Sequence, residues 1–157
     1  MQPLPANTLV AYTDGSTYRN NPGPVSWAVV FVRDGVVCRV EHGALSHGTN
    51  NRAELLAVIW ALERETTEDL VIRSDSLYVV NCATQRWQRR ANLDLWERFE
   101  RAYAYRTRRG LATTFEHVHG HQADPYNIFV DEEARRAGEA AASCLPGRTE
   151  PATSLPS

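Results

Sequence analysis

Long apolar runs, paired cysteines and lysine are all missing from this chain of 157 residues. No apolar run reaches the roughly 18 residues that a membrane-spanning helix needs, so we expect no membrane partner. The amino end lacks a basic start followed by an apolar stretch, which argues against a secretory signal. The three cysteines, Cys38, Cys82 and Cys144, form no CxxC pair. They predict reduced thiols in a cytoplasmic protein and argue against a zinc site or a disulfide framework.

Every one of the 17 basic residues is an arginine. A gene rich in G and C is a sufficient explanation, although arginine also forms bidentate phosphate contacts better than lysine does. The formal net charge of −2 does not by itself indicate a nucleic-acid partner. The segment 86–109 differs from the rest, because it carries eight arginines against three acidic residues. We therefore expect a local basic surface there.

The pattern of apolar residues and turns predicts one α/β domain with the element order βββ-α-β-α-α-β-α. Asp34-Gly35 between two β-rich runs is a strong hairpin signal. Leu55, Ile59 and Leu62 repeat at helical spacing. Strands are expected over residues 9–14, 26–32, 36–43, 70–74 and 112–118. Helices are expected over residues 50–65, 76–83, 127–142 and from Asp94 onward, with a further helical turn over 86–90.

This order implies a five-stranded mixed sheet, in which a three-strand antiparallel meander is followed by βα units, with helices on both faces. The many Pro, Gly, Ser and Thr residues near the carboxyl end, with few apolar anchors, predict a disordered tail. The expected organisation is an N-terminal extension over 1–8, one folded domain over 9–142 and a C-terminal tail over 143–157.

Four carboxylates stand at the ends of expected strands or the starts of expected helices: Asp14, Glu54, Asp75 and Asp131. Each has a structural explanation when it is taken alone. Asp14 before Gly15 is typical of a turn, and Glu54 would close a capping box at a helix start. Asp75 suits an N-cap, and Asp131 would complement a helix dipole. For any single one, the structural explanation is the stronger.

As a set, the four carboxylates predict a metal centre. If the first and fourth strands are neighbours in the sheet, Asp14 and Asp75 end at the same edge. Two helices packed on that sheet can bring Glu54 and Asp131 to the same point. Converging carboxylates repel one another unless a cation lies among them. Oxygen ligands without Cys or His suit Mg²⁺ or Mn²⁺ better than Zn²⁺.

Four blocks of sequence around these carboxylates resemble, in the same order, the motifs of the type 1 ribonuclease H (ribonuclease HI) family. The blocks are Tyr12–Ser16 with Asn21–Pro24, Thr49–Leu55, Ser74–Val79, and Val118–His121 with Asn127 and Asp131–Ala134. A single DGS triplet would be weak, whereas the ordered set is highly specific. The resemblance spans residues 9–142 and implies a ribonuclease H-like fold, with the family's catalytic domain over that range.

The resemblance implies endonucleolytic hydrolysis of the RNA strand of an RNA–DNA hybrid by two-metal-ion catalysis, giving 5′-phosphate and 3′-hydroxyl products. The residues that would hold two Mg²⁺ ions, for which Mn²⁺ could substitute, are Asp14, Glu54, Asp75 and Asp131. His121, ten residues before the last of these, would assist water activation or product departure. His117 and His119 have no carboxylate partner at metal-site spacing, so we expect them to be structural.

The same resemblance implies contacts with the hybrid near the start of the first helix. The positions that match family contacts in the minor groove, where the 2′-hydroxyls of RNA lie, are Asn21, Asn50 and Asn51, helped by exposed backbone near Gly15. Thr49 and Arg52 could contact phosphate. Turn and cap roles are equally open for the asparagines, because Asn is a favoured cap residue.

The chain departs from the family pattern at two places. Leu77 stands where many members carry a glutamine that contacts bases in the minor groove. The segment 85–93 also replaces a long basic protrusion found in many bacterial members. The residues that could form a reduced handle, stacking on sugar and gripping DNA phosphates, are Trp87 with Arg86, Arg89 and Arg90. The alternative is that Trp87 is ordinary packing and that the handle surface is weak.

Three other functions compete with the hybrid nuclease. A catalytically weak hybrid-binding module would be expected to lack an acidic ligand, and all four are present. A DNA-directed nuclease or integrase of the same superfold is disfavoured by the Asn51-Arg52 motif and by the histidine segment. The terminal domain of a reverse transcriptase is disfavoured by the Met start and the tail. We expect a monomer with no obligate protein partner.

Overall fold

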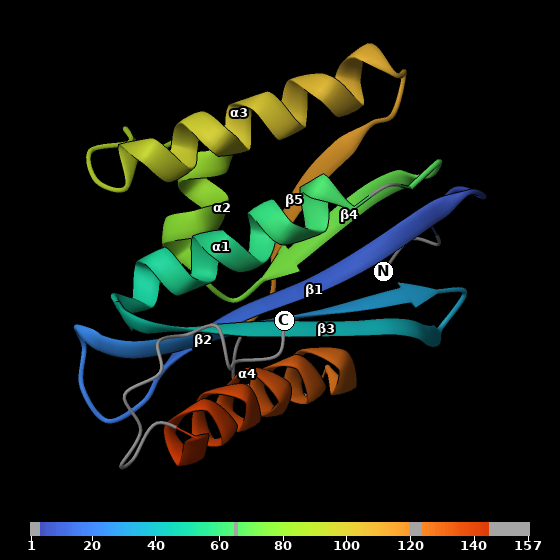
Figure 1. The fold of residues 1–157 in the computed structure, drawn as a ribbon. Coiled ribbons are helices and arrows are strands. Elements are labelled where there is room, and N and C mark those ends of the chain that lie inside the picture. Colours follow the sequence, from blue (N-terminus) through green and yellow to red (C-terminus); the bar gives the residue numbers. More distant parts are fainter. Residues whose placement is uncertain (1–3, 65, 120–123, 145–157) are drawn as a thin grey trace.

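The computed structural model describes residues 4–64, 66–119 and 124–144. The expected element order is confirmed in this part of the chain (Figure 1). The elements are β1 (Thr8–Thr17), β2 (Gly23–Arg33), β3 (Val36–Gly48), α1 (Asn50–Glu63), β4 (Asp69–Ser74), α2 (Leu77–Ala83), α3 (Leu93–Arg108), β5 (Thr113–His117) and α4 (Pro125–Cys144). Of these helices, none is long and apolar enough to cross a membrane.

The strands form one mixed sheet in the order β3-β2-β1-β4-β5, which confirms the predicted fold class. β1 pairs antiparallel with β2, and β2 with β3. β1 pairs parallel with β4, and β4 with β5. Figure 1 shows α1, α2 and α3 on one face of the sheet and α4 on the other. The central position of β1, between an antiparallel and a parallel neighbour, places its residues where both halves of the fold meet.

Alternate residues of the strands feed two apolar layers, because successive side chains of a strand point to opposite faces. Leu9 and Ala11 of β1 pack under α1 and α3, in a cluster that includes Phe99. Val10 and Tyr12 point the other way and pack under α4, against Val130 and Ala134. This alternation fixes which face each later residue of β1 can reach.

β1 continues past Asp14, although the sequence suggested a turn there. On one side, β2 still pairs with the strand at Gly15↔Trp27 and Ser16↔Ser26. On the other side, the pairing with β4 ends at Thr13↔Ser74. Asp14 therefore lies inside β1, at the point where the strand outlasts its parallel neighbour. The turn explanation was wrong because pairing with β2, the next strand of the chain, extends β1 through Thr17.

The helical turn expected over 86–90 is absent from the structure, which shows bends at 86–87 and no regular structure over 88–90. The left-handed Gln85 and the contacts of Arg89 with carbonyls of α2 end the helical course at Ala83. α1 ends at Glu63, and α4 starts two residues earlier than expected because Pro125 suits a first helical position. α4 also runs to Cys144, two residues past the expected tail boundary; residues 145–157 lie outside the described part.

Candidate metal centre

Three carboxylates converge where β1 and β4 stop pairing. Asp14 follows Thr13, the last residue of β1 that pairs with β4, and Asp75 follows Ser74, the last residue of β4. Glu54 reaches the same point from near the start of α1. One oxygen of each side chain lies within 4.8 Å of the others. Asp14 and Glu54 are buried, and Asp75 is half-buried.

Asp131 lies beside this triad and completes the expected set from α4. Its carboxylate raises the pKa of Asp14, and its charge also raises the pKa of Glu54 and of Asp75. It is exposed and is not one of the three residues with mutually close oxygens. Asp131 is also the seventh residue of α4, so the structural explanation as an acidic residue at the helix beginning was wrong.

Burial and mutual repulsion raise the pKa of each carboxylate in the triad. For Asp14, burial is the largest cause and the charge of Glu54 the second. Burial also raises the pKa of Glu54 and of Asp75, followed by the charge of Asp75 on Glu54 and of Asp131 on Asp75. Full ionisation of this site is therefore unfavourable in the protein alone, and a bound cation would relieve it.

The buried oxygens also fit a metal ion by their hydrogen bonding. Oδ2 of Asp14 is buried and has no hydrogen-bond partner among the residues that the structure describes, which is costly for a charged group. Two neighbouring oxygens are held by one donor: the backbone N–H of Gly15 donates to Asp14 Oδ1 at 2.9 Å and to Glu54 Oε1 at 2.8 Å. An orphaned carboxylate oxygen in an all-oxygen cluster suits a hard divalent cation. The triad could therefore hold a metal ion.

The cap residues of α1 and α2 are neighbours of the carboxylates, not the carboxylates themselves. Thr49 caps α1, accepting the N–H of Arg52 at 3.2 Å, so Glu54 closes no capping box. Ser76 caps α2, accepting the N–H of Val79 at 3.1 Å, so Asp75 is not the cap. Both structural explanations from the sequence were wrong. Because Thr49 and Ser76 cap the two helices, the carboxylates of Glu54 and Asp75 are available to the candidate metal centre.

Sequence reasoning did not propose Asn127 as a site residue, although it lies in the last motif. Its side chain hydrogen-bonds the carboxylate of Asp75, and it is 1% exposed. It stands one helical turn before Asp131, on the same side of α4. That i, i+4 spacing was the signal that could have identified it. His117 also approaches this corner, with Nε2 3.3 Å from the backbone oxygen of Asp75.

The proposed substrate residues gather at the start of α1. Asn21 Oδ1 accepts the backbone N–H of Asn50 at 3.0 Å, which ties the β1–β2 connection to the helix. Asn51 is exposed, and Thr49 is the cap. Gly15 is a close-approach position, since a Cβ there would lie 2.4 Å from the backbone nitrogen of Glu54.

Two arginines that we proposed as phosphate contacts form ion pairs with acidic side chains of the same chain. Arg52 forms a two-point ion pair with Asp94, with N–O distances of 3.0 and 2.6 Å. Arg89 turns inward, where Nη1 lies 2.6 Å from Glu100 and the guanidinium lies 4.4 Å from the ring centre of Trp96.

The other handle residues face outward. Trp87 is 48% exposed, and Arg90 is exposed. Arg86 is exposed as well, so the structure separates the expected handle into three outward residues and one inward arginine. His121 lies outside the described residues.

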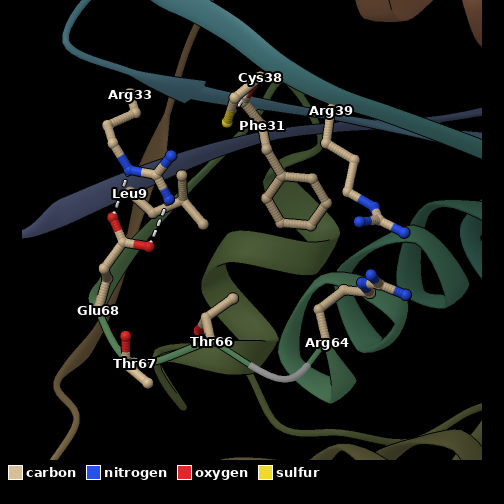
Figure 2. Close-up of a pocket in the computed structure, with 9 residues that line it drawn as sticks. All are labelled: Leu9, Phe31, Arg33, Cys38, Arg39, Arg64, Thr66, Thr67 and Glu68. Carbon is tan, nitrogen blue, oxygen red and sulfur yellow. Dashed lines mark hydrogen bonds and ion pairs between the residues drawn. The ribbon is translucent and has the colours of Figure 1, made fainter.

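A hollow of about 340 Å³ lies at the other end of the molecule, beside the start of β1 and the end of α1 (Figure 2). Its walls carry the two-point Arg33–Glu68 pair and, opposite it, the guanidinium groups of Arg39 and Arg64. Leu9 lines it, five residues and roughly 16 Å of strand before Asp14. The hollow is therefore separate from the carboxylate cluster.

Comparison with known proteins gives a consistent result. Residues 6–139 match the family model described as RNase H. A ribonuclease H of Neorickettsia sennetsu is 33% identical over 152 residues, which cover 87% of this chain and 97% of that protein. RNase H1 of the archaeon Halobacterium salinarum is 31% identical, with a TM-score of 0.71, over 85% of this chain and 99% of that one. LC11-RNase H1, solved in complex with an RNA/DNA hybrid, is 25% identical, with a TM-score of 0.72 and the same coverage.

Proposed function

The chain belongs to the ribonuclease H family, and on that premise we propose that it hydrolyses the RNA strand of RNA–DNA hybrids. Cleavage is endonucleolytic and leaves 5′-phosphate and 3′-hydroxyl ends. The observation that carries the proposal is the carboxylate triad, in which Asp14 and Glu54 are buried and Oδ2 of Asp14 has no partner in the described part of the chain. The relative solved with an RNA/DNA hybrid supports the substrate.

Asp14, Glu54, Asp75 and Asp131 would hold two Mg²⁺ ions, with Mn²⁺ as a substitute. When bound, the ions supply positive charge at the attacking and leaving oxygens of the phosphodiester. The backbone N–H of Gly15 keeps the carboxylates of Asp14 and Glu54 side by side.

Two further side chains act beside these ligands. Asn127 orients the carboxylate of Asp75 from α4, which lies on the face of the sheet opposite α1. His121 would transfer a proton at the attacking water or at the leaving oxygen, because an imidazole titrates near neutral pH.

The hybrid would lie across the start of α1. The residues proposed to face the minor groove and its 2′-hydroxyls are Gly15, Asn21, Asn50 and Asn51. Thr49 and Arg52 would contact phosphate, and Arg52 would have to share its guanidinium with Asp94. Their gathering at one helix start, beside Glu54, supports this orientation.

The segment after α2 would form a reduced handle. Trp87 would stack on sugar, and Arg90 would grip DNA phosphates. Arg89 would take part by holding the segment on α3 through Trp96 and Glu100. We further propose that the protein acts in the cytoplasm as a monomer, for which a single species of 17.6 kDa in sedimentation would be the expected result.

The test uses four labelled substrates of one sequence: an RNA–DNA hybrid, duplex RNA, duplex DNA and single-stranded RNA. Each is incubated with Mg²⁺ or with a chelator. We expect cutting of the hybrid's RNA strand alone, abolished by the chelator and by Asp14→Asn. Equal cutting of duplex DNA would contradict the substrate, and 5′-hydroxyl products would contradict the chemistry. Hybrid binding without cutting in Mg²⁺ or Mn²⁺ would identify a binding module instead.

A further inference from the structure

A polar row crosses three strands on the face of the sheet that α4 covers. Tyr12 of β1 pairs in register with Arg73 of β4, and Arg73 with Glu116 of β5. Arg73 Nη1 donates to the Tyr12 hydroxyl at 2.9 Å, and its Nε donates to Glu116 Oε1, also at 2.9 Å. Arg73 is 7% exposed, so its charge depends on these partners.

The row continues into the start of α4. The Tyr12 hydroxyl donates to Asp124 Oδ2 at 3.0 Å. The other oxygen of Asp124 accepts the backbone N–H of Tyr126 at 3.0 Å and of Asn127 at 3.4 Å. Asp124 thus caps α4 with one oxygen while the other is held by the sheet. A continuous path of hydrogen bonds links β5, β4 and β1 to the first turn of this helix.

Three of these elements, β1, the end of β4 and α4, carry three of the four proposed metal ligands, and Glu54 comes from α1. Residues two apart in a strand share a face. Asp14 therefore follows Tyr12, and Asp75 follows Arg73, on the same face of the sheet at a distance of two residues. From α4, Asn127 hydrogen-bonds Asp75, and the next turn carries Asp131. A shift of the start of α4 along β1 and β4 would therefore move both of these residues relative to the carboxylates.

We propose that Tyr12, Arg73 and Asp124 are positioning residues, which fix the start of α4 so that Asn127 and Asp131 face Asp14 and Asp75. The inference rests on the proposed metal-dependent hydrolysis and adds the residues that set its geometry. Other polar ties of α4 run to the opposite half of the sheet. Ser26 donates to the backbone oxygen of Ala134 at 2.5 Å, and Tyr126 to that of Gly35 at 2.6 Å. Those two ties hold α4 to β2 and to the turn between β2 and β3, whereas the row holds the start of α4 to β1.

The variant Tyr12→Phe tests the proposal, because it removes the hydroxyl and keeps the ring that packs 5.4 Å from Tyr126. Mn²⁺ affinity is measured by calorimetry without substrate, and kcat and KM are measured with the hybrid. Outer partners of metal ligands typically contribute 10- to 100-fold, and for this more distant hydroxyl we expect about a tenfold loss of Mn²⁺ affinity. We expect kcat to fall by a similar factor while KM stays within about twofold.

Tyr78→Phe is the matched control. Its hydroxyl accepts from Asn92 Nδ2 and from Trp96 Nε1, both at 3.1 Å, on the other face of the sheet. Both variants should lower Tm, but only Tyr12→Phe should weaken Mn²⁺ binding. A Tyr12→Phe protein that loses Tm and keeps wild-type Mn²⁺ affinity and kcat would show that the row is only structural.

A double-mutant cycle tests whether the residues act as one chain. Asp124→Asn keeps an oxygen for the helix cap but loses the acceptor for the Tyr12 hydroxyl. The double variant Tyr12→Phe, Asp124→Asn should lose no more Mn²⁺ affinity than the worse single variant. Additive losses would contradict the chain. Because Mn²⁺ binding is read without substrate, a wild-type protein that binds Mn²⁺ but cuts no hybrid would refute the proposed function while leaving this comparison valid.

Discussion

The backbone of Gly15 in β1 contacts both the side chain and the backbone of Glu54 in α1. The backbone N–H of Gly15 donates to Glu54 Oε1 at 2.8 Å, and a Cβ on Gly15 would lie 2.4 Å from the Glu54 nitrogen. Only a residue without a side chain lets α1 approach β1 this far. The position of Glu54 beside Asp14 therefore depends on the lack of a Cβ atom at residue 15.

Gly15→Ala should consequently damage both the fold and the activity. The added methyl must push α1 from β1, which costs about 1–3 kcal/mol in unfolding free energy for an overpacked site. Hybrid cleavage should fall by about 100-fold, because displacements near 1 Å can have that effect. Urea unfolding and initial rates measure the two effects. Gly110→Asn is the control, since it has open space and a left-handed φ that Asn tolerates. Normal cleavage by Gly15→Ala would contradict the close-approach account.

The metal-free protein should lose stability as pH rises. A carboxyl group whose pKa is raised by folding binds its proton more tightly in the folded state than in the unfolded chain. For Glu54 the pKa rises from the ordinary 4.5 to about 8, and Asp14 is raised in the same direction. The free energy of unfolding should therefore fall as pH rises from 4.5 to about 8. The fall is up to about 1.4 kcal/mol per pH unit for each proton that the folded state binds in excess of the unfolded chain.

Urea titrations between pH 5 and 8 with a chelator, over the range given by that Glu54 shift, measure the slope. Asp14→Asn removes a buried charge and should flatten the slope while abolishing cleavage. Mg²⁺ should also flatten it in the wild-type protein, because the ions favour the ionised carboxylates. A slope that Asp14→Asn leaves unchanged would mean that other groups set the pH dependence.

His121→Ala should slow turnover without weakening the hybrid complex. General acid–base catalysis by a positioned imidazole typically contributes 10²- to 10⁴-fold, so we expect a loss of kcat within that range. Single-turnover rates and binding titrations in Ca²⁺ separate chemistry from affinity. His119→Ala, two residues away, is the control and should keep most activity. Normal turnover by His121→Ala would remove this residue from the mechanism.

Arg90→Ala should weaken hybrid binding and reduce its salt dependence. Removing one arginine–phosphate interaction should lower the slope of log affinity against log salt by about 0.9. Arg101→Ala, a similarly exposed arginine on α3, should leave the slope unchanged. Arg89→Ala should instead lower Tm, since this guanidinium packs on Trp96 and pairs with Glu100. Equal slopes for Arg90→Ala and the wild-type protein would exclude a handle at this position.

The element order, the mixed sheet and the acidic set were predictable from the sequence, because local patterns carry them. Strand and helix periods of two and 3.6 residues are readable within a dozen positions. The order of the motif blocks then indicated the family and predicted that Asp14, Glu54 and Asp75 belong to one cluster. That the three carboxylates do converge depended on β1 and β4 being neighbours, which the structure shows.

Tertiary structure alone decided which role each ambiguous residue takes. Glu54 could have closed a capping box, but Thr49 caps α1 and the carboxylate of Glu54 accepts the N–H of Gly15. Arg89 reads as a surface charge in sequence, yet it packs on Trp96. The row from Tyr12 through Arg73 to Glu116 spans more than 100 positions, and strand register between distant segments leaves no local pattern. Sequence therefore determined the chemistry of this protein, and packing determined the geometry that brings it together.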